Sequence, residues 1–172
     1  MTTKTEQKES SAKAVSGKDS GGQATVRALR PNDLDAVIAI DEGNVGRARR
    51  GFFVTRLEAV KRDPTMFLAV GVEDAGELAG FVIARVFRGE FGTSEPVASI
   101  DAIAVGAAKQ GKGLGAALIS GLEAEMRERG IADVMSQDLW SGARLMRFLA
   151  ANGFELAPRW VLERSLDEPI DF

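Results

Sequence analysis

The chain of 172 residues contains no cysteine, no histidine and no tyrosine. Without cysteine it can form no disulfide, no thiolate metal site and no thiol nucleophile. Without histidine and tyrosine it lacks the commonest general acid–base group, the usual zinc ligands and any phenolic proton donor. We expect no metal, and any proton transfer must use carboxylates, lysines, water or the backbone.

Strong net charge and long apolar runs are missing as well. The net charge is −3 at pH 7, which gives no electrostatic footprint for nucleic acid. No apolar run approaches the length of a membrane span, and the N-terminus shows no hydrophobic secretory segment. We therefore expect a cytoplasmic protein whose partners include neither a membrane nor nucleic acid.

The composition changes once along the chain, near residue 24. Residues 1–24 are mostly Lys, Ser, Thr, Gly and Glu, with little to bury, and we expect a disordered N-terminal tail. Residues 25–168 carry the apolar periodicity of one α/β domain without internal repeats. Strands are predicted over 25–29, 66–72, 78–87, 97–105 and 132–139, with a terminal hairpin of 154–157 and 161–165. Helices are predicted from Leu34 to a stop at Gly43, and over 52–62, 116–129 and 142–152.

The most informative stretch is the one from Ser99 to Gly121. A strand-like run ends at Val105, a Gly-rich segment follows over 110–115, and a helical pattern begins at Ala116. The first N–H groups of a helix lack internal partners and carry partial positive charge. Glycines leave room for phosphate oxygens close to that backbone. The physical interpretation is a pyrophosphate cradle.

Other interpretations of this turn are open. The plainest is a flexible entry to a surface helix. A P-loop is excluded because Lys112 is followed by Gly113 and not by Ser or Thr. A dinucleotide fingerprint could start at Gly111 with Ala116 as its third small residue and Asp133 as its acid. The strand and helix candidates that precede Ser99 argue against it, since that fingerprint belongs on a first strand.

The pattern Gln110-x-x-Gly113-x-Gly115, preceded by Ile103-Ala104-Val105, resembles the acyl-CoA-binding signature of the GNAT superfamily of N-acetyltransferases. The resemblance runs from about residue 26 to 164 and includes a helix that closes with Asn152-Gly153-Phe154. It implies an α/β fold with a mixed, mostly antiparallel sheet of about six or seven strands and about four helices. In that fold the fourth and fifth strands splay apart. It also implies acetyl-CoA as co-substrate, a primary amine as acceptor, and a homodimer as one option.

The resemblance assigns the co-substrate site to two segments. Backbone N–H groups at the end of the fourth strand would pair with the pantetheine arm and the thioester carbonyl. The Gly-rich turn would hold the pyrophosphate, and basic side chains would meet the phosphates unless they are simply solvated. The residues implied are Ile103, Ala104, Val105, Gln110, Gly111, Lys112, Gly113, Leu114, Gly115, Ala116 and Arg144, with Lys109 as a further basic candidate.

Asp101 is the candidate general base. Aspartate is disfavoured within strands, yet it interrupts an apolar run four residues before Val105, where several family members place their base. The alternative is a structural aspartate that is hydrogen-bonded to a turn or paired with an arginine. Ser99 shares its face and would suit a relay water, and Glu90 and Glu95 are weaker candidates.

The acceptor site is expected between the first two helices and the end of the fifth strand, again from the resemblance. Solvated charges and a core tryptophan are the alternatives. The candidates are Asp41, Glu42, Arg50, Gln137, Asp138 and Trp140.

The chain departs from the family pattern twice. Leu149 stands where many members have the tyrosine that protonates the thiolate, and Ser141-Gly142 stands where an asparagine often contacts pantetheine. A catalytically silent acyl-CoA-binding module is therefore the alternative to an enzyme. A nucleotide-binding regulator is a third hypothesis, and it requires ADP or NAD to bind as tightly as acetyl-CoA.

Overall fold

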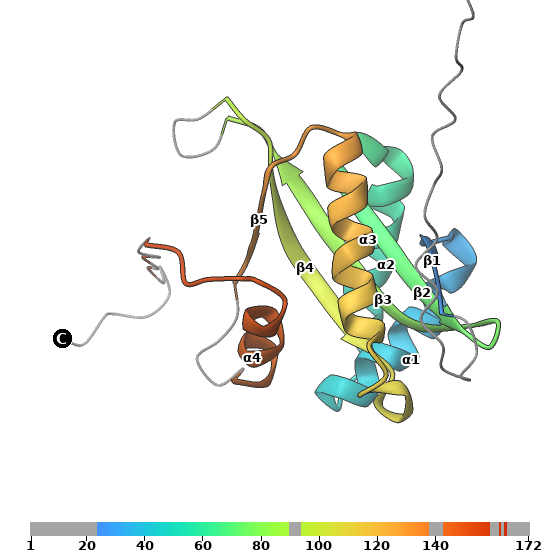
Figure 1. The fold of residues 1–172 in the computed structure, drawn as a ribbon. Coiled ribbons are helices and arrows are strands. Elements are labelled where there is room, and N and C mark those ends of the chain that lie inside the picture. Colours follow the sequence, from blue (N-terminus) through green and yellow to red (C-terminus); the bar gives the residue numbers. More distant parts are fainter. Residues whose placement is uncertain (1–23, 90–93, 138–142, 159–161, 163, 165–172) are drawn as a thin grey trace, which may run out of the picture.

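A computed structural model describes residues 24–89, 94–137 and 143–158, with the isolated residues 162 and 164. The first 23 residues, and with them almost all of the predicted tail, lie outside this description. Figure 1 shows the fold of the described part. Its strands and α-helices are β1 (Thr25–Ala28), α1 (Leu34–Val45), α2 (Arg50–Arg62), β2 (Phe67–Asp74), β3 (Glu77–Phe87), β4 (Val97–Val105), α3 (Leu114–Glu128), β5 (Asp133–Ser136) and α4 (Ala143–Ala151).

The strands form one mixed sheet in the order β1-β2-β3-β4-β5. Neighbours are antiparallel except β4 and β5, which run parallel. This confirms the predicted mixed, mostly antiparallel α/β fold. The count of six or seven strands is wrong for the described residues, where five occur. After α4, the Phe154 N–H bonds the Leu149 carbonyl and closes the helix, and residues 155–158 are exposed and irregular instead of forming a strand.

Helices cover both faces of the sheet (Figure 1). Leu118 and Leu122 of α3 are buried in a core on one face. Val37 of α1 and Phe53 of α2 are buried in a separate core on the other. Where a strand is regular, every second residue contributes to the same core, as Leu68, Val70 and Val72 of β2 do, because strand side chains alternate between faces.

Two helix ends differ from the sequence prediction. Helix α1 continues past Gly43 and ends at Gly46, whose φ of 74° and N–H bond to the Glu42 carbonyl form a left-handed cap. Glycine is tolerated within a helix, so Gly43 alone did not stop it. Helix α3 begins at Leu114, two residues before the predicted start, because Gly113 with φ 77° already turns the chain into the helix.

Strand β4 carries a bulge at Asp101. Ile83 of β3 pairs with Ala102 and Ala84 pairs with Ile100, so Asp101 has no residue opposite it. A bulge adds one residue to one strand and locally shifts the alternation of its side chains. Asp101 and Ala102 consequently both face the α1–α2 side of the sheet.

Strands β4 and β5 separate partway along their length. Their pairing runs from Val97 with Asp133 to Ile100 with Ser136. Strand β4 then continues for five residues, 101–105, without a β5 partner in the described part of the chain. Figure 1 shows β5 diverging from β4, as the predicted splay requires.

The link between β1 and α1 is held by Arg27, which donates to both carboxylate oxygens of Asp33 at 2.7 and 2.9 Å. Burial acts to raise the pKa of Asp33, but hydrogen bonds from Arg27 and from the Arg30 backbone outweigh it, so the pKa is lowered. A lowered carboxyl pKa means that the pair stabilises the fold above about pH 4 and that this stabilisation is lost as the pH falls further.

We expect Asp33→Asn to lower the free energy of unfolding by about 2 kcal/mol at neutral pH, or roughly 4–8 °C in Tm. The difference from wild type should shrink below about pH 4, as measured by thermal unfolding across pH. Asp35→Asn is the control, because Asp35 and Arg50 form an exposed pair that contributes little. Equal losses in the two variants, or a pH-independent loss in Asp33→Asn, would contradict the prediction.

Candidate functional site

The candidate site begins at the end of β4, where the edge that faces away from β3 has no β5 partner in the described part of the chain. Ile103, Ala104 and Val105 are half-buried there, and Val105 pairs with Gly80 on β3. An exposed strand edge offers backbone N–H and C=O groups to an extended amide chain. A pantetheine arm has this chemistry, and the prediction assigned these residues to it.

The Gly-rich turn connects the end of β4 to the N-terminus of α3. The first helical hydrogen bond runs from the Ala117 N–H to the Gly113 carbonyl at 3.0 Å. The N–H groups of Leu114, Gly115 and Ala116 therefore have no acceptor within the helix, and Gly113 has no side chain to cap them. The Leu114 side chain is buried in the core, so only its backbone can serve an anion. This is the geometry of an anion site at a helix N-terminus.

Gly115 is required by packing as well as by the turn. A Cβ built on Gly115 would lie 2.7 Å from Cε2 of Phe148 on α4. This absence of a side chain lets α4 approach the first turn of α3. The sequence signature identified Gly115, but its partner Phe148 could not be read from the spacing.

Gln110 connects three segments at the end of β4. Its Nε2 donates to Oδ1 of Asn44 at 2.9 Å and to the Val105 carbonyl at 3.0 Å. Nδ2 of Asn44, in the last turn of α1, donates to the same carbonyl at 3.0 Å. Arg144 of α4 donates through Nη2 to Oε1 of Gln110. Asn44 was not predicted, because no local pattern relates it to a carbonyl 61 residues away.

The basic side chains of the turn have a carboxylate partner. Lys109 Nζ lies 2.7 Å from Oδ2 of Asp74, in the β2–β3 hairpin, and Lys112 Nζ lies 4.0 Å from the same oxygen. The hydrogen bond from Lys109 lowers the pKa of Asp74. Gly111 is in the left-handed region with φ 78°. Lys109 and Lys112 therefore lie beside the turn, with Asp74 competing with an incoming phosphate for both.

Asp101 lies between two guanidinium groups. Nε of Arg56 on α2 is 3.0 Å from Oδ2, and Nη2 of Arg85 on β3 is 3.0 Å from Oδ1. The Asp101 side chain is only 8% exposed. Arg56 also packs over the rings of Phe52 and Phe67, with its guanidinium carbon 5.2 and 5.7 Å from the centroids. Asp101 thus has the arginine partners that its structural role requires. The role of Asp101 as general base stays a prediction.

The predicted acceptor residues are dispersed. Asp41 is buried and accepts two hydrogen bonds from Arg49, at 2.8 and 2.5 Å. The hydrogen bond to Asp41 raises the pKa of Arg49. Arg50 pairs with Asp35 at 3.0 Å, both side chains well exposed.

The remaining predicted residues are exposed or lie outside the described part. Glu42 is exposed near the end of α1, and Gln137 is exposed just after β5. Leu149, in the position where the family resemblance led us to look for a tyrosine, is buried in the α3-side core. Asp138, Trp140, Ser141, Gly142 and Glu90 lie outside the described residues.

Two further classes of site were sought in the part of the chain that the structure describes. No group of three or more carboxylates there is arranged to hold a metal ion. None of its helices combines the length and the apolar character that crossing a bilayer requires.

Comparison with known proteins identifies the family. The profile of the acetyltransferase (GNAT) family matches residues 36–154, which is more than half of the chain, and the chain belongs to this family. No curated protein sequence matches the chain significantly.

Solved structures share the fold at low sequence identity. An aminoglycoside N-acetyltransferase, AAC(6')-Iy, in complex with CoA, superposes with a TM-score of 0.72 at 16% identity, over 85% of this chain and 97% of that one. A transcriptional regulator from Bacillus halodurans C-125 gives 0.71 at 18%, over 84% and 100%. The ribosomal-protein-S18-alanine N-acetyltransferase from Escherichia coli gives 0.63 at 24%, over 78% and 79%.

Proposed function

We propose that this protein is an N-acetyltransferase that moves the acetyl group of acetyl-CoA to a primary amine in a ternary complex. The observation that carries the proposal is one continuous segment. At 101–105 the edge of β4 away from β3 has no β5 partner among the described residues, and the chain then leads through a glycine turn to the free N–H groups of α3. Strand-edge amides suit the pantetheine arm, and helix N-terminal amides suit the pyrophosphate. Family membership and the CoA complex of a structural neighbour support the same assignment.

The reaction is direct attack by the neutral amine nitrogen on the thioester carbon. The new C–N bond forms as the C–S bond breaks, CoA leaves as a thiolate, and the ammonium nitrogen releases one proton. Amines of this type have a pKa near 10.4, so most of the acceptor must lose a proton before attack. Successive N–H groups of a strand point to opposite edges, and the Gly106 N–H bonds the Ala79 carbonyl on β3. The N–H groups of Ile103 and Val105 therefore lie on the edge away from β3 and would stabilise the oxyanion that develops on the carbonyl, while that of Ala104 faces Phe81.

Asp101 would organise proton removal without accepting the proton itself. Both of its oxygens already accept hydrogen bonds from Arg85, and the Arg56 guanidinium lies 3.0 Å from one of them, which leaves them poorly placed to meet an amine. A water relay towards solvent then takes the amine proton, and the released thiolate is protonated from solvent, since no tyrosine, histidine or cysteine exists in the chain. The competing proposal is that Asp101 is itself the base. The two proposals predict different rates and pH profiles for Asp101→Asn.

A catalytically silent acyl-CoA-binding module is the second candidate. It is favoured by the buried Leu149 in the position of the expected acid, and a structural neighbour is described as a transcriptional regulator. Three further points stay predictions from the sequence. They are the identity of the acceptor among small amines, protein N-termini and lysines, the cytoplasmic location, and a homodimer.

Thermal unfolding with acetyl-CoA, with NAD and ATP as controls, tests the site. At about a hundred times its Kd a ligand stabilises the fold by about 2.7 kcal/mol, which should raise Tm by roughly 5–10 °C. We expect this shift with acetyl-CoA only. Equal shifts with NAD or ATP would instead favour the nucleotide-binding regulator, and no shift at millimolar acetyl-CoA would contradict the proposal.

A matched pair of variants tests whether acetyl-CoA binds at the N-terminus of α3. Ala116 is exposed in the first turn of α3, and Ala124 is exposed farther along the same helix. Ala116→Glu adds a carboxylate where the pyrophosphate would bind, at a helix end that tolerates negative charge. We expect Ala116→Glu to fold and lose the acetyl-CoA shift, while Ala124→Glu retains it.

Release of the CoA thiol with a panel of amines then separates the enzyme from the silent module. Turnover with any amine supports the transferase. A full Tm shift without turnover across the panel supports the module.

A further inference from the structure

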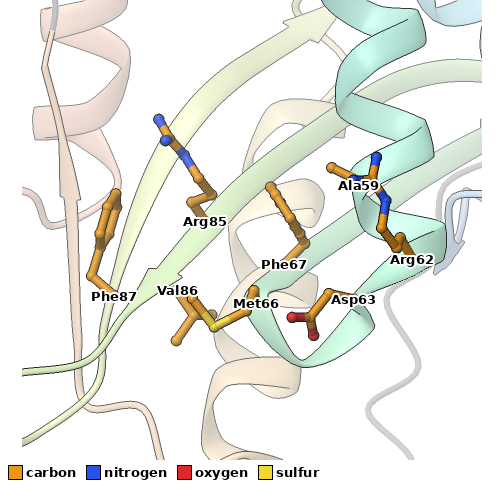
Figure 2. Close-up of a pocket in the computed structure, with 8 residues that line it drawn as sticks. All are labelled: Ala59, Arg62, Asp63, Met66, Phe67, Arg85, Val86 and Phe87. Carbon is orange, nitrogen blue, oxygen red and sulfur yellow. The ribbon is translucent and has the colours of Figure 1, made fainter.

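A pocket of about 440 Å³ lies between the end of α2 and β3, away from the Gly-rich turn. Figure 2 shows Arg85 and Phe87 on one side of it, Ala59, Arg62 and Asp63 on the other, and Phe67 between them. Met66 and Val86 complete the lining. The walls combine aromatic and aliphatic surface with two guanidinium groups, so the pocket suits a molecule that has both an apolar part and a charged part.

The charge around this pocket is positive. Arg62 and Arg85 line it, and Arg56 adjoins it through the shared carboxylate of Asp101. Asp63, which accepts a hydrogen bond from Thr65 at 2.7 Å, is the one carboxylate in the lining. The three guanidinium groups of Arg56, Arg62 and Arg85 carry one positive charge more than the two carboxylates of Asp63 and Asp101 neutralise.

Arg85 is placed to serve both Asp101 and a ligand. Its Nε and Nη2 make the contacts to Asp101, and these contacts do not involve Nη1. The side chain is 41% exposed and its guanidinium packs over the ring of Phe87 at 5.2 Å. A planar guanidinium held in this way binds carboxylate or phosphate oxygens through parallel N–H donors.

The same geometry removes the acids that a cationic acceptor would need. Asp41 is paired with Arg49, and Asp101 is paired with Arg56 and Arg85. Asp41 is a buried member of the predicted acceptor set and Asp101 is the candidate base, and each is already neutralised. On the α1–α2 face of the sheet, the groups left to contact a ligand in this pocket are chiefly arginine and aromatic side chains.

The pocket lies within reach of the predicted acetyl position. Arg85 is opposite Ser99 on β4, and Ser99 precedes Ile103 by four residues, or about 13 Å along a strand. Arg85 and Asp101 both lie on the α1–α2 face, where the resemblance places the acceptor. A molecule with its amine near Ile103 could therefore extend along β4 and place its far end beside Arg85.

We propose that the pocket between α2 and β3 binds the far end of the amine acceptor, and that this end carries an anionic group, carboxylate or phosphate, next to an apolar segment. The inference rests on the proposed acetyltransferase function and names the class of its acceptor. Arg62 and Arg85 would attract the anion from opposite walls of the pocket, while Phe67, Phe87 and Met66 would cover the apolar segment.

The test compares matched acceptors that differ only in the far end. CoA release is measured with ω-amino carboxylates of increasing chain length, with ω-aminoalkyl phosphates, and with the corresponding n-alkylamines. We expect kcat/KM to be at least about tenfold higher for an anionic acceptor of suitable length. A higher value for carboxylates or for phosphates identifies which anion the pocket prefers. Equal use of the uncharged alkylamines at every length would overturn the proposal.

Arg62→Gln and Lys61→Gln form the matched pair of variants. Both residues are exposed near the end of α2 and each change removes one positive charge, but only Arg62 lines the pocket. Arg85 is left intact because it also holds Asp101. We expect Arg62→Gln to reduce the preference for anionic acceptors several-fold and Lys61→Gln to retain it. Equal effects in both variants would overturn the assignment to this pocket.

A binding experiment without an amine separates this proposal from the proposed function. Alkyl carboxylates should raise Tm in wild type and in Lys61→Gln but less in Arg62→Gln, whether or not acetyl-CoA binds. If acetyl-CoA binds and neither carboxylates nor anionic acceptors are preferred, the present proposal fails alone. If carboxylates bind through Arg62 and acetyl-CoA does not bind, the acetyltransferase proposal fails and the pocket is an anion site of another kind.

Discussion

Asp101→Asn is expected to lower the free energy of unfolding by about 3 kcal/mol, because it leaves the guanidiniums of Arg56 and Arg85 without their shared counter-charge. The Asp101 side chain is 8% exposed, so water cannot fully replace the lost carboxylate. For a domain of this size the loss corresponds to roughly 6–12 °C in Tm. Urea unfolding should show a lower midpoint with an unchanged m-value.

Asp133→Asn is the matched control, since Asp133 is an exposed carboxylate on β5. It should change stability by less than about 0.5 kcal/mol. If Asp101→Asn were as stable as Asp133→Asn, the two arginine contacts would contribute no net stability and the structural role of Asp101 would be wrong.

The same variant separates positioning from direct proton transfer. Loss of a general base typically lowers the rate by about 10²–10⁴-fold and removes one limb of the pH–rate profile. If Asp101 only organises the site, kcat measured well below Tm should fall less than about tenfold and the pH profile should keep its shape. We expect the second result. A collapse of kcat at unchanged KM, with loss of the alkaline rise, would establish Asp101 as the base.

Much of the fold could be predicted from the sequence because local patterns determine it. The bounds of β4 were predicted as Val97 to Val105 and observed as such, since an apolar run ends at a glycine. The strands predicted over 66–72 and 78–87 leave a short connection, and its residues Ala75 and Gly76 have φ of 56° and 82°, as a tight two-residue turn requires. Such signals lie within a few residues of one another.

What the sequence did not reveal depends on register and on distant partners. The ion pairs of Asp101 require the bulge that places it on the face of Arg85 and Arg56, and a bulge depends on how β3 and β4 align. The contact of Asn44 with Val105 joins the end of α1 to the end of β4. The single sequence gives each residue type but not these pairings, so it left Asp101 open between a general base and a structural aspartate paired with an arginine.

The charge of the acceptor site illustrates the same limit. The sequence gives the number of acidic residues but does not show which of their carboxylates are already paired with arginine. In the structure, Asp41 and Asp101 are matched by Arg49, Arg56 and Arg85. A buried carboxylate is rarely left unpaired because of the cost of its desolvation, so the surplus arginine, and not the acid, determines what a ligand meets.

Gly115→Ala is expected to weaken acetyl-CoA binding and to destabilise the fold by about 2 kcal/mol, within the range for overpacking. A Cβ at this position would lie 2.7 Å from Cε2 and 3.1 Å from Cζ of Phe148. Relief requires Phe148 or the whole of α4 to move, and α4 carries Arg144, the donor to Gln110 of the turn. Packing and co-substrate binding should therefore change together, as measured by urea unfolding and by acetyl-CoA titration.

Phe148→Leu provides the test that this coupling is specific, because leucine lacks the ring atoms nearest Gly115. The single variant should lose some core packing, since Phe148 packs against the α3-side core. In the Phe148→Leu variant, Gly115→Ala should lower the free energy of unfolding by at least about 1 kcal/mol less than it does in wild type. A difference of this size is typical of two residues in contact in a double-mutant cycle. Additive losses would mean that glycine is needed for the backbone or for the phosphate itself, and that α4 is not what restricts this position. A coupling of the expected size, with acetyl-CoA affinity recovered in the double variant, would make Phe148 the reason that this chain requires glycine at residue 115.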